Sequence, residues 1–173
     1  MSRRVHVQTS TPPLDLGRGL VEAFLANERV NQVLLELLDP AVWRAFPTSS
    51  PRRNIATSFA HIHNVRCMKV KMSGGAPPPR LDRGELTRAQ ASKGLAASAR
   101  AMAALIARCV AAGGKVPGFR PGVAVMVTAA VNHEAHHRGQ VCHWARELGA
   151  PIGPEQALRL WDWDRHWRAV VGG

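Results

Sequence analysis

The chain has 173 residues, of which 46% are hydrophobic, and its 23 lysine and arginine residues against 12 acidic ones give a net charge of +11. That length allows one domain with a core and leaves little room for a second. The excess positive charge keeps nucleic acid among the candidate partners, but the basic residues are dispersed in ones and twos, which is typical of a solvated basic surface. Because no apolar targeting segment and no stretch of about 18 uncharged apolar residues is found, we expect a cytoplasmic protein that does not enter a membrane.

Proline and glycine clusters divide the chain into segments with helical periodicity. A first helix is expected over 14–38, after the Pro12-Pro13 pair. A second is expected to begin at Ser50-Pro51, with serine as the N-cap and proline at the first helical position, and to run to about Met72.

Two further helices are expected in the second half of the chain. Thr87 and Gln90 have the spacing of a capping box, and the alanine-rich stretch after them favours a helix over 87–110. The last long helix is expected over 122–148, where Gly149 ends it. With no strand-like alternation and no internal repeat, the sequence predicts an all-α four-helix bundle with short additional helices.

A tryptophan-rich extension follows from about residue 153 and contains Trp161, Trp163 and Trp167. Base stacking and anchoring at a membrane interface are functional interpretations of such a segment, but packing against the core is favoured. We expect one domain over 1–173, with the extension forming a short helix over one end of the bundle.

The stretch 133–137, His-Glu-Ala-His-His, lies in the last predicted long helix. His133 and His137 are four residues apart, so both imidazoles lie on one helical face and can reach one ion. An unpaired buried polar group costs about 1–3 kcal/mol, so two core-facing imidazoles favour a metal site. The two histidines share their face, the core-facing stripe, with apolar residues: Met126, Ala130, Val141, Trp144 and Leu148.

A third ligand is expected from the second helix, where periodicity alone leaves both His61 and His63 open. Three histidines would leave one coordination position for water or substrate, whereas a structural site usually closes with four protein ligands. The three cysteines, Cys67, Cys109 and Cys142, are an odd number without C-x-x-C spacing, which indicates buried reduced thiols rather than ligands.

The same stretch satisfies H-E-x-x-H, in which Glu134 would be the general base of a metalloprotease. His143 lies six residues beyond His137, as in metzincins, but the glycine stands at 139, one residue early. In a continuous helix His143 is about 120° around from His137 and cannot share the ion. We therefore disfavour a protease and expect Glu134, off the core-facing stripe, to be a surface residue or to support a ligand. Gln140, one turn beyond His137, is expected to orient a ligand or a bound water.

The pattern His133-x-x-x-His137-Arg138-Gly139-Gln140, followed by Leu-Gly-Ala-Pro at 148–151, resembles the DinB/YfiT-like family of damage-inducible and thiol-transferase-related proteins. The stretch 59–62, Phe-Ala-His-Ile, is similar to the first histidine motif of that family. Asn31 and Trp43 are also in keeping with it, and the resemblance covers roughly 14–152.

The resemblance implies a bundle that binds zinc, nickel or a similar divalent ion near one end through His61, His133 and His137, often as a homodimer. It also implies a metal-dependent enzyme that uses a low-molecular-weight thiol to transfer or isomerise a small-molecule substrate, or that hydrolyses it. Two alternatives stay open, a bundle with a purely structural metal and a DNA-associated stress-response protein. Against the latter, no helix-turn-helix spacing and no concentrated basic helix is found, so nucleic-acid binding should be weak.

Overall fold

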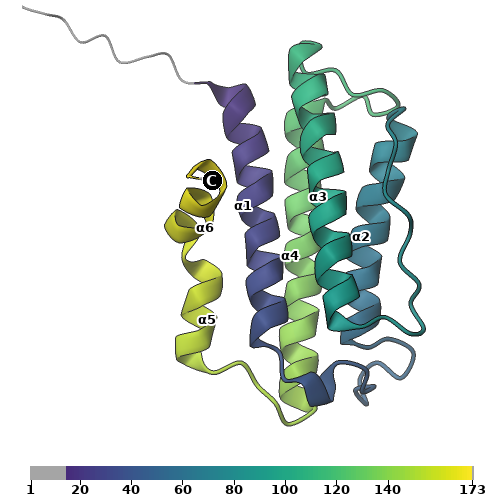
Figure 1. Ribbon diagram of the computed structural model, residues 1–173, viewed down its shortest axis with the longest axis vertical. Coiled ribbons are helices and arrows are strands. Elements are labelled where there is room, and N and C mark those ends of the chain that lie inside the picture. The colour runs from purple at the N-terminus through teal and green to yellow at the C-terminus, as the bar shows by residue number, and fades with distance from the viewer. Residues whose placement is uncertain (1–14, 173) are drawn as a thin grey trace, which may run out of the picture.

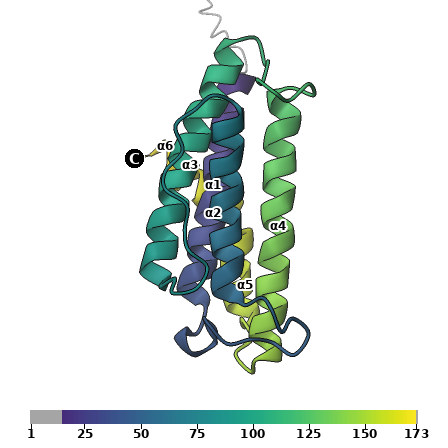
Figure 2. The same cartoon turned by 90° about the vertical axis from the view of Figure 1, so that its right-hand side faces the viewer.

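The computed structural model describes residues 15–172, so the Pro12-Pro13 pair and Leu14 lie outside the described residues. Within that range the protein is all-α, and its only strand-type pairing is an isolated bridge between Val116 and Phe119. Four long helices pack side by side and two short ones follow (Figures 1 and 2). The helices are α1 (Leu16–Leu37), η1 (Pro40–Val42), α2 (Ile55–Met72), α3 (Arg88–Ala111), α4 (Val123–Glu147), α5 (Pro154–Trp161) and α6 (Trp163–Val171).

The helix boundaries follow from side-chain caps, and one of them corrects a prediction. The capping box of Thr87 and Gln90 is confirmed at the start of α3. The second helix does not begin at Ser50-Pro51, which lies in a turn, but at Ile55. Asn54 displaces the predicted cap because it forms a capping box of its own: its Oδ1 accepts from the Thr57 backbone N–H at 2.9 Å, and the Thr57 hydroxyl accepts from its N–H at 3.0 Å.

The core consists of two apolar clusters separated along the bundle axis. One contains Trp43, Phe59 and Leu95, and the other contains Phe24 and Met102. Between them each long helix contributes buried polar side chains at about the same height. This buried polar layer consists of Asn27, Glu28, Asn31, Arg66, Ser98 and Glu134.

The C-terminal extension does not cover an end of the bundle. It forms two short helices, α5 and α6, that pack along the side of α1 (Figure 1). The prediction of tryptophan core packing was wrong, since Trp161, Trp163 and Trp167 are 74%, 41% and 43% exposed. The least exposed residues of α5 and α6 are instead Ala157, Leu160, Val170 and the buried His166. Trp167 donates through Nε1 to Glu22 at 2.8 Å.

By length and composition, α3 is the one helix of residues 15–172 that is apolar enough to cross a membrane. The stretch of about 18 uncharged apolar residues sought in the sequence is a stricter criterion, and α3 does not meet it because Lys93, Arg100 and Arg108 lie within the helix. In the fold α3 packs against α1 and α2, and its fully buried side chains belong to both apolar clusters. Its place in the structure is that of a bundle helix.

A candidate metal centre between α2 and α4

His61, His133 and His137 bring their imidazole nitrogens together between α2 and α4. The Nε2 atom of His133 lies 3.1 Å from Nε2 of His61 and 3.1 Å from Nε2 of His137. One ring nitrogen from each residue lies within 4.8 Å of the others, and no carboxylate or thiol of the described chain joins this histidine cluster. Of the three cysteines, Cys67 and Cys109 are buried and Cys142 is half-buried.

The cluster lies halfway along α4, not near one end of the bundle. His133 comes ten residues after Val123, the first residue of α4, and His137 ten before Glu147, the last. The resemblance implied a site close to one end. His133 and His137 interrupt the apolar core-facing stripe in the middle of α4. They therefore lie at the height of the buried polar layer.

Hydrogen bonding selects the tautomer of His137. Its Nδ1 lies 2.8 Å from Oε1 of Gln140, an acceptor, so Nδ1 carries the proton. Nε2 then keeps its lone pair and points it toward the other two rings. Metal-binding histidines are usually oriented in this way by a partner on the far nitrogen, so the predicted orienting role of Gln140 agrees with its position.

The surroundings favour the neutral form of all three rings, which is the form that binds a metal. Burial, followed by the neighbouring imidazoles and the positive charges of Arg83 and Arg53, lowers the pKa of His61 to about 4. Burial likewise lowers the pKa of His133 and His137, and Arg53 contributes to the shift of His137.

We expect His61 of the metal-free protein to titrate near pH 4 rather than near the ordinary value of about 6.5. Its unfolded form takes up a proton below about pH 6.5 and its folded form does not, so the free energy of unfolding should fall as the pH drops from about 6.5 toward 4. A ¹H NMR titration of the imidazole Cε1 protons measures the pKa, and urea unfolding over the same pH range measures the free energy of unfolding. A midpoint for His61 near 6.5 would contradict the burial argument.

The remaining histidines of this region lie outside the cluster. His63 is buried on the side of α2 that faces α3, where its ring nitrogens lie 2.8 Å from the Gly94 carbonyl oxygen and 2.9 Å from that of Pro79. His136 and His143 are exposed. Periodicity left His61 and His63 open, and the fold places only His61 opposite the pair on α4.

Glu134 is not a surface residue, as the stripe analysis had allowed, but belongs to the buried polar layer with 1% exposure. Arg66 donates through Nε and Nη2 to its two oxygens at 2.7 and 2.6 Å, and Asn27 and Asn31 donate to Oε2 at 2.6 and 2.9 Å. The sequence carried a signal for this burial, because Glu134 stands four residues after Ala130 and seven before Val141, both of which are on the core-facing stripe.

Sequence analysis missed Arg66 and Glu28, the other charged residues of this layer. Arg66 is 1% exposed, and its Nη1 lies 2.7 Å from Oε2 of Glu28. Burial raises the pKa of Glu134, but the charge and hydrogen bonds of Arg66 outweigh it and leave that pKa below its ordinary value. Glu134 is therefore an ionised partner of Arg66.

The buried polar layer fixes α4 against α1 and α2 next to the histidine cluster. Arg138, directly after His137, donates to Oδ1 of Asn31 on α1 at 2.9 Å. Asn31, which the resemblance singled out, therefore contacts both Glu134 and Arg138. These contacts set the rotation of α4, and with it the direction in which its histidines point.

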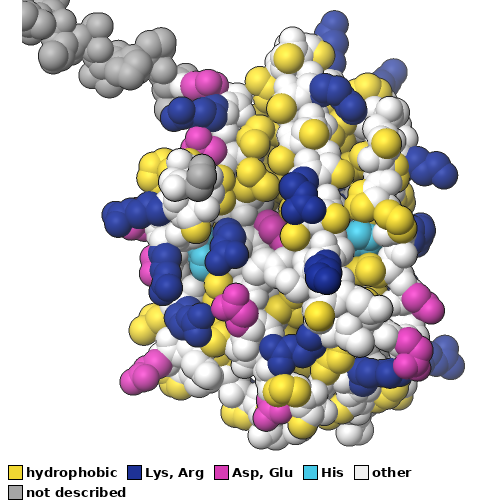
Figure 3. Space-filling model, in the orientation of Figure 1, with side chains coloured by type: hydrophobic (Ala, Val, Ile, Leu, Met, Phe, Trp, Pro, Cys, Tyr) yellow, Lys and Arg dark blue, Asp and Glu magenta, His cyan; other side chains and the backbone are white. Residues whose placement is uncertain are grey.

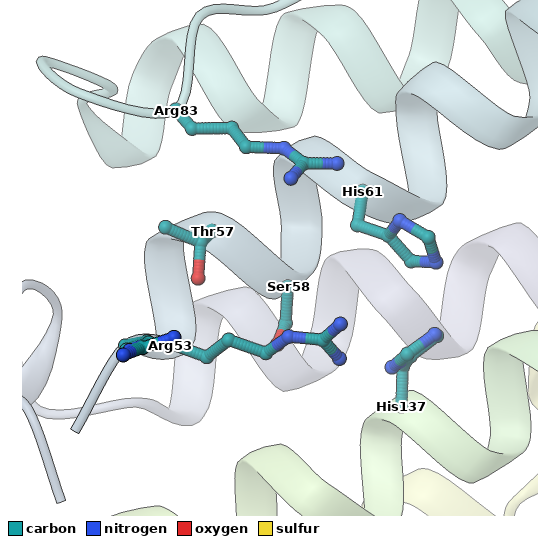
Figure 4. A pocket seen from close by; sticks show the side chains of 7 residues that line it. Arg53, Thr57, Ser58, His61, Arg83 and His137 are labelled. Carbon is teal, nitrogen blue, oxygen red and sulfur yellow. The ribbon is translucent and has the colours of Figure 1, made fainter. Parts of the chain in front are cut away.

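A small cavity of about 140 Å³ opens beside the cluster. Figure 4 shows Arg53 and Arg83 extending toward it from two different loops, with His61 and His137 at its inner side. The residues that line it are Arg52, Arg53, Thr57, Ser58, His61, Arg83 and His137.

One protein family matches the part of this chain that contains α4 and its two cluster histidines. Residues 120–168 match the DinB family. The resemblance predicted from the sequence is confirmed over this stretch, which runs from the loop before α4 into α6, and the all-α packing is consistent with a DinB four-helix bundle. His133 and His137 lie inside the DinB match and His61 outside it. No match was found among curated proteins or among solved structures.

Proposed function

We propose that this protein is a metal-dependent enzyme that uses a low-molecular-weight thiol in a transfer or isomerisation reaction, or that hydrolyses its substrate. The observation that carries the proposal is the convergence of three Nε2 atoms beside an open cavity, with no fourth ligand from the described chain. A site with three protein ligands leaves a position for an exogenous group, as catalytic zinc sites do.

The donor set fits a divalent ion. Tetrahedral zinc with Zn–N bonds of about 2.0–2.1 Å has ligand nitrogens about 3.4 Å apart, close to the two separations of 3.1 Å in the cluster. Imidazole nitrogens suit zinc and nickel among other transition metals, and His61, His133 and His137 would hold the ion. Such an ion supplies Lewis acidity, which lowers the pKa of a thiol or water in the open position.

The protein's own residues supply orientation and access. Gln140 holds the ring of His137 so that Nε2 faces the other imidazoles, and the buried polar layer keeps α4 from rotating. The cavity lies beside these rings and gives a small ligand group access to them from one side. In a transfer reaction the sulfur would form a bond to the electrophilic carbon, the leaving group would depart with its electron pair, and the thiol proton would pass to solvent.

The metalloprotease alternative has less support. The carboxylate of Glu134 is bound by Arg66 and two asparagines and so does not have the free oxygen that a general base requires. His143 is exposed, and residues 15–172 contain no strand beside α4 to align a peptide.

The DNA-associated alternative also has little support. Lysine and arginine side chains are scattered over the face drawn in Figure 3 and do not gather into a stripe. Weak, salt-sensitive nucleic-acid binding, a homodimeric state and a cytoplasmic location are parts of the proposal that rest on composition and on the DinB resemblance.

We expect about one zinc or nickel ion per chain in protein purified without a histidine tag, measured by elemental analysis. A screen of low-molecular-weight thiols with electrophilic substrates should then show turnover that disappears on chelation and returns with the metal. Robust metal-dependent cleavage of casein would instead support the protease. A cobalt-substituted protein whose absorption spectrum, with no thiol added, shows a cysteine or carboxylate of the protein as fourth ligand would make the site structural.

A further inference from the structure

We propose that the cavity beside the histidine cluster binds a carboxylate or phosphate group of the substrate or thiol, held by Arg53 and Arg83. This inference rests on the proposed function for its link to catalysis, but the anion site can be tested without any metal. It adds a chemical class to the ligand: a small organic oxyanion.

The cavity carries only positive charge. Three of its seven lining residues are arginines, Arg52, Arg53 and Arg83, and none is acidic. They come from two separate loops, one before α2 and one before α3, so the fold and not the local sequence brings Arg83 to the other two. Like charges gathered around one small space repel each other, and an anion bound among them relieves that repulsion.

In the part of the chain that the structure describes, these arginines have no protein partner. Within residues 15–172, Arg52, Arg53 and Arg83 form no ion pair and donate no side-chain hydrogen bond to a protein acceptor. Arg44, in the same region, pairs with Glu85 at 2.9 Å, and Arg66 is held by Glu28 and Glu134. Guanidinium groups bind carboxylates and phosphates through paired N–H donors, so free ones that face a cavity suit such a ligand.

The cavity wall offers a further donor. Ser58 is 4% exposed and lines the cavity, where its hydroxyl can donate to a bound anion. It lies in the first turn of α2, where the helix dipole adds positive potential. The hydroxyl of Thr57, by contrast, is used in the helix cap and donates to the Asn54 carbonyl oxygen at 2.8 Å.

The size of the cavity limits the ligand. Its volume of about 140 Å³ is below the roughly 300–1,000 Å³ of pockets that enclose a drug-sized molecule. It therefore takes one charged group and a few neighbouring atoms. Because His61 and His137 form its inner side, a thiol or electrophilic carbon a few bonds from that group would reach the ion (Figure 4).

The test uses the full chain, freed of metal and dialysed, in 150 mM salt. Calorimetric titrations with succinate and with inorganic phosphate measure anion affinity, and neutral succinamide reports binding that does not need charge. The variant R53A/R83A removes the two guanidinium groups. R100A/R120A is the matched control, because Arg100 and Arg120 are also exposed and lie away from the cavity, and it lowers the net charge equally.

We expect R53A/R83A to weaken binding of succinate, phosphate or both by at least about tenfold, as the loss of charge-assisted hydrogen bonds predicts, and R100A/R120A to change it less than about twofold. Whichever anion binds more tightly identifies the group. An unchanged affinity in R53A/R83A, an equal loss in the control, or no anion binding by the parent protein would overturn the inference. Anion binding by a chain that takes up no zinc would refute the proposed function and leave the anion site standing.

Discussion

Replacing His61 by alanine is expected to reduce zinc affinity by at least about 100-fold, so that the purified variant contains almost no metal. The change removes one of three nitrogen donors, while even residues that only orient a ligand cost about 10–100-fold when altered. His61 is partly exposed at the edge of the cluster, so the fold should tolerate the truncation. Elemental analysis and competition with a chromophoric chelator measure both quantities.

Two neighbouring histidines provide the controls. His136→Ala removes an exposed ring directly before His137 on α4 and should leave the zinc content unchanged. His63→Ala removes a buried ring bonded to the Gly94 and Pro79 carbonyl groups, so it should lower stability and keep most of the metal. Loss of zinc in His63→Ala, with retention in His61→Ala, would move the ligand to His63.

Glu134→Gln is expected to lower the free energy of unfolding by about 3 kcal/mol. Removing one partner of a buried ion pair typically costs about 3–5 kcal/mol, because the other charge stays buried without compensation. The lower value applies here because Glu28 remains 2.7 Å from Arg66. For a protein of this size the loss corresponds to a fall in Tm of roughly 10 °C.

Glu155→Gln is the matched control, since Glu155 is exposed and forms no ion pair within the described chain, and it should change stability by no more than about 0.5 kcal/mol. Urea unfolding of the metal-free variants separates this effect from metal binding. If Glu134→Gln is as stable as the parent, the ion pair with Arg66 does not hold α4 in place.

Local sequence signals were sufficient for the helices. Proline and glycine clusters, the Thr87 capping box and helical periodicity predicted four long helices with ends close to those observed, because caps and turns depend on neighbouring residues. The start of α2 was misplaced since Ser50 and Asn54 are both good N-caps. Only the fold, in which the Asn54 side chain also donates to the Arg44 carbonyl oxygen, favours the second.

The candidate ligands could be predicted in part for the same reason. His133 and His137 share a helical face through their spacing of four residues, which holds in any α-helix. The choice of His61 over His63 depended on the family resemblance, because packing decides which side of α2 faces α4. Glu134 could have been placed from its spacing to Ala130 and Val141, but Arg66 and Glu28 gave no such signal.

What the sequence alone determined, then, is the set of helices and the histidine pair on α4, which follow from interactions between residues a few positions apart. The tertiary structure decided which histidine of α2 meets that pair, that Glu134 is buried against Arg66, and that the tryptophans of the extension face outward. It also brought Arg83 to Arg53 beside the cluster. These outcomes depend on how each helix is rotated about its axis when it packs against the others. That rotation is set by which of its faces, taken over the whole length of the helix, buries the most apolar surface.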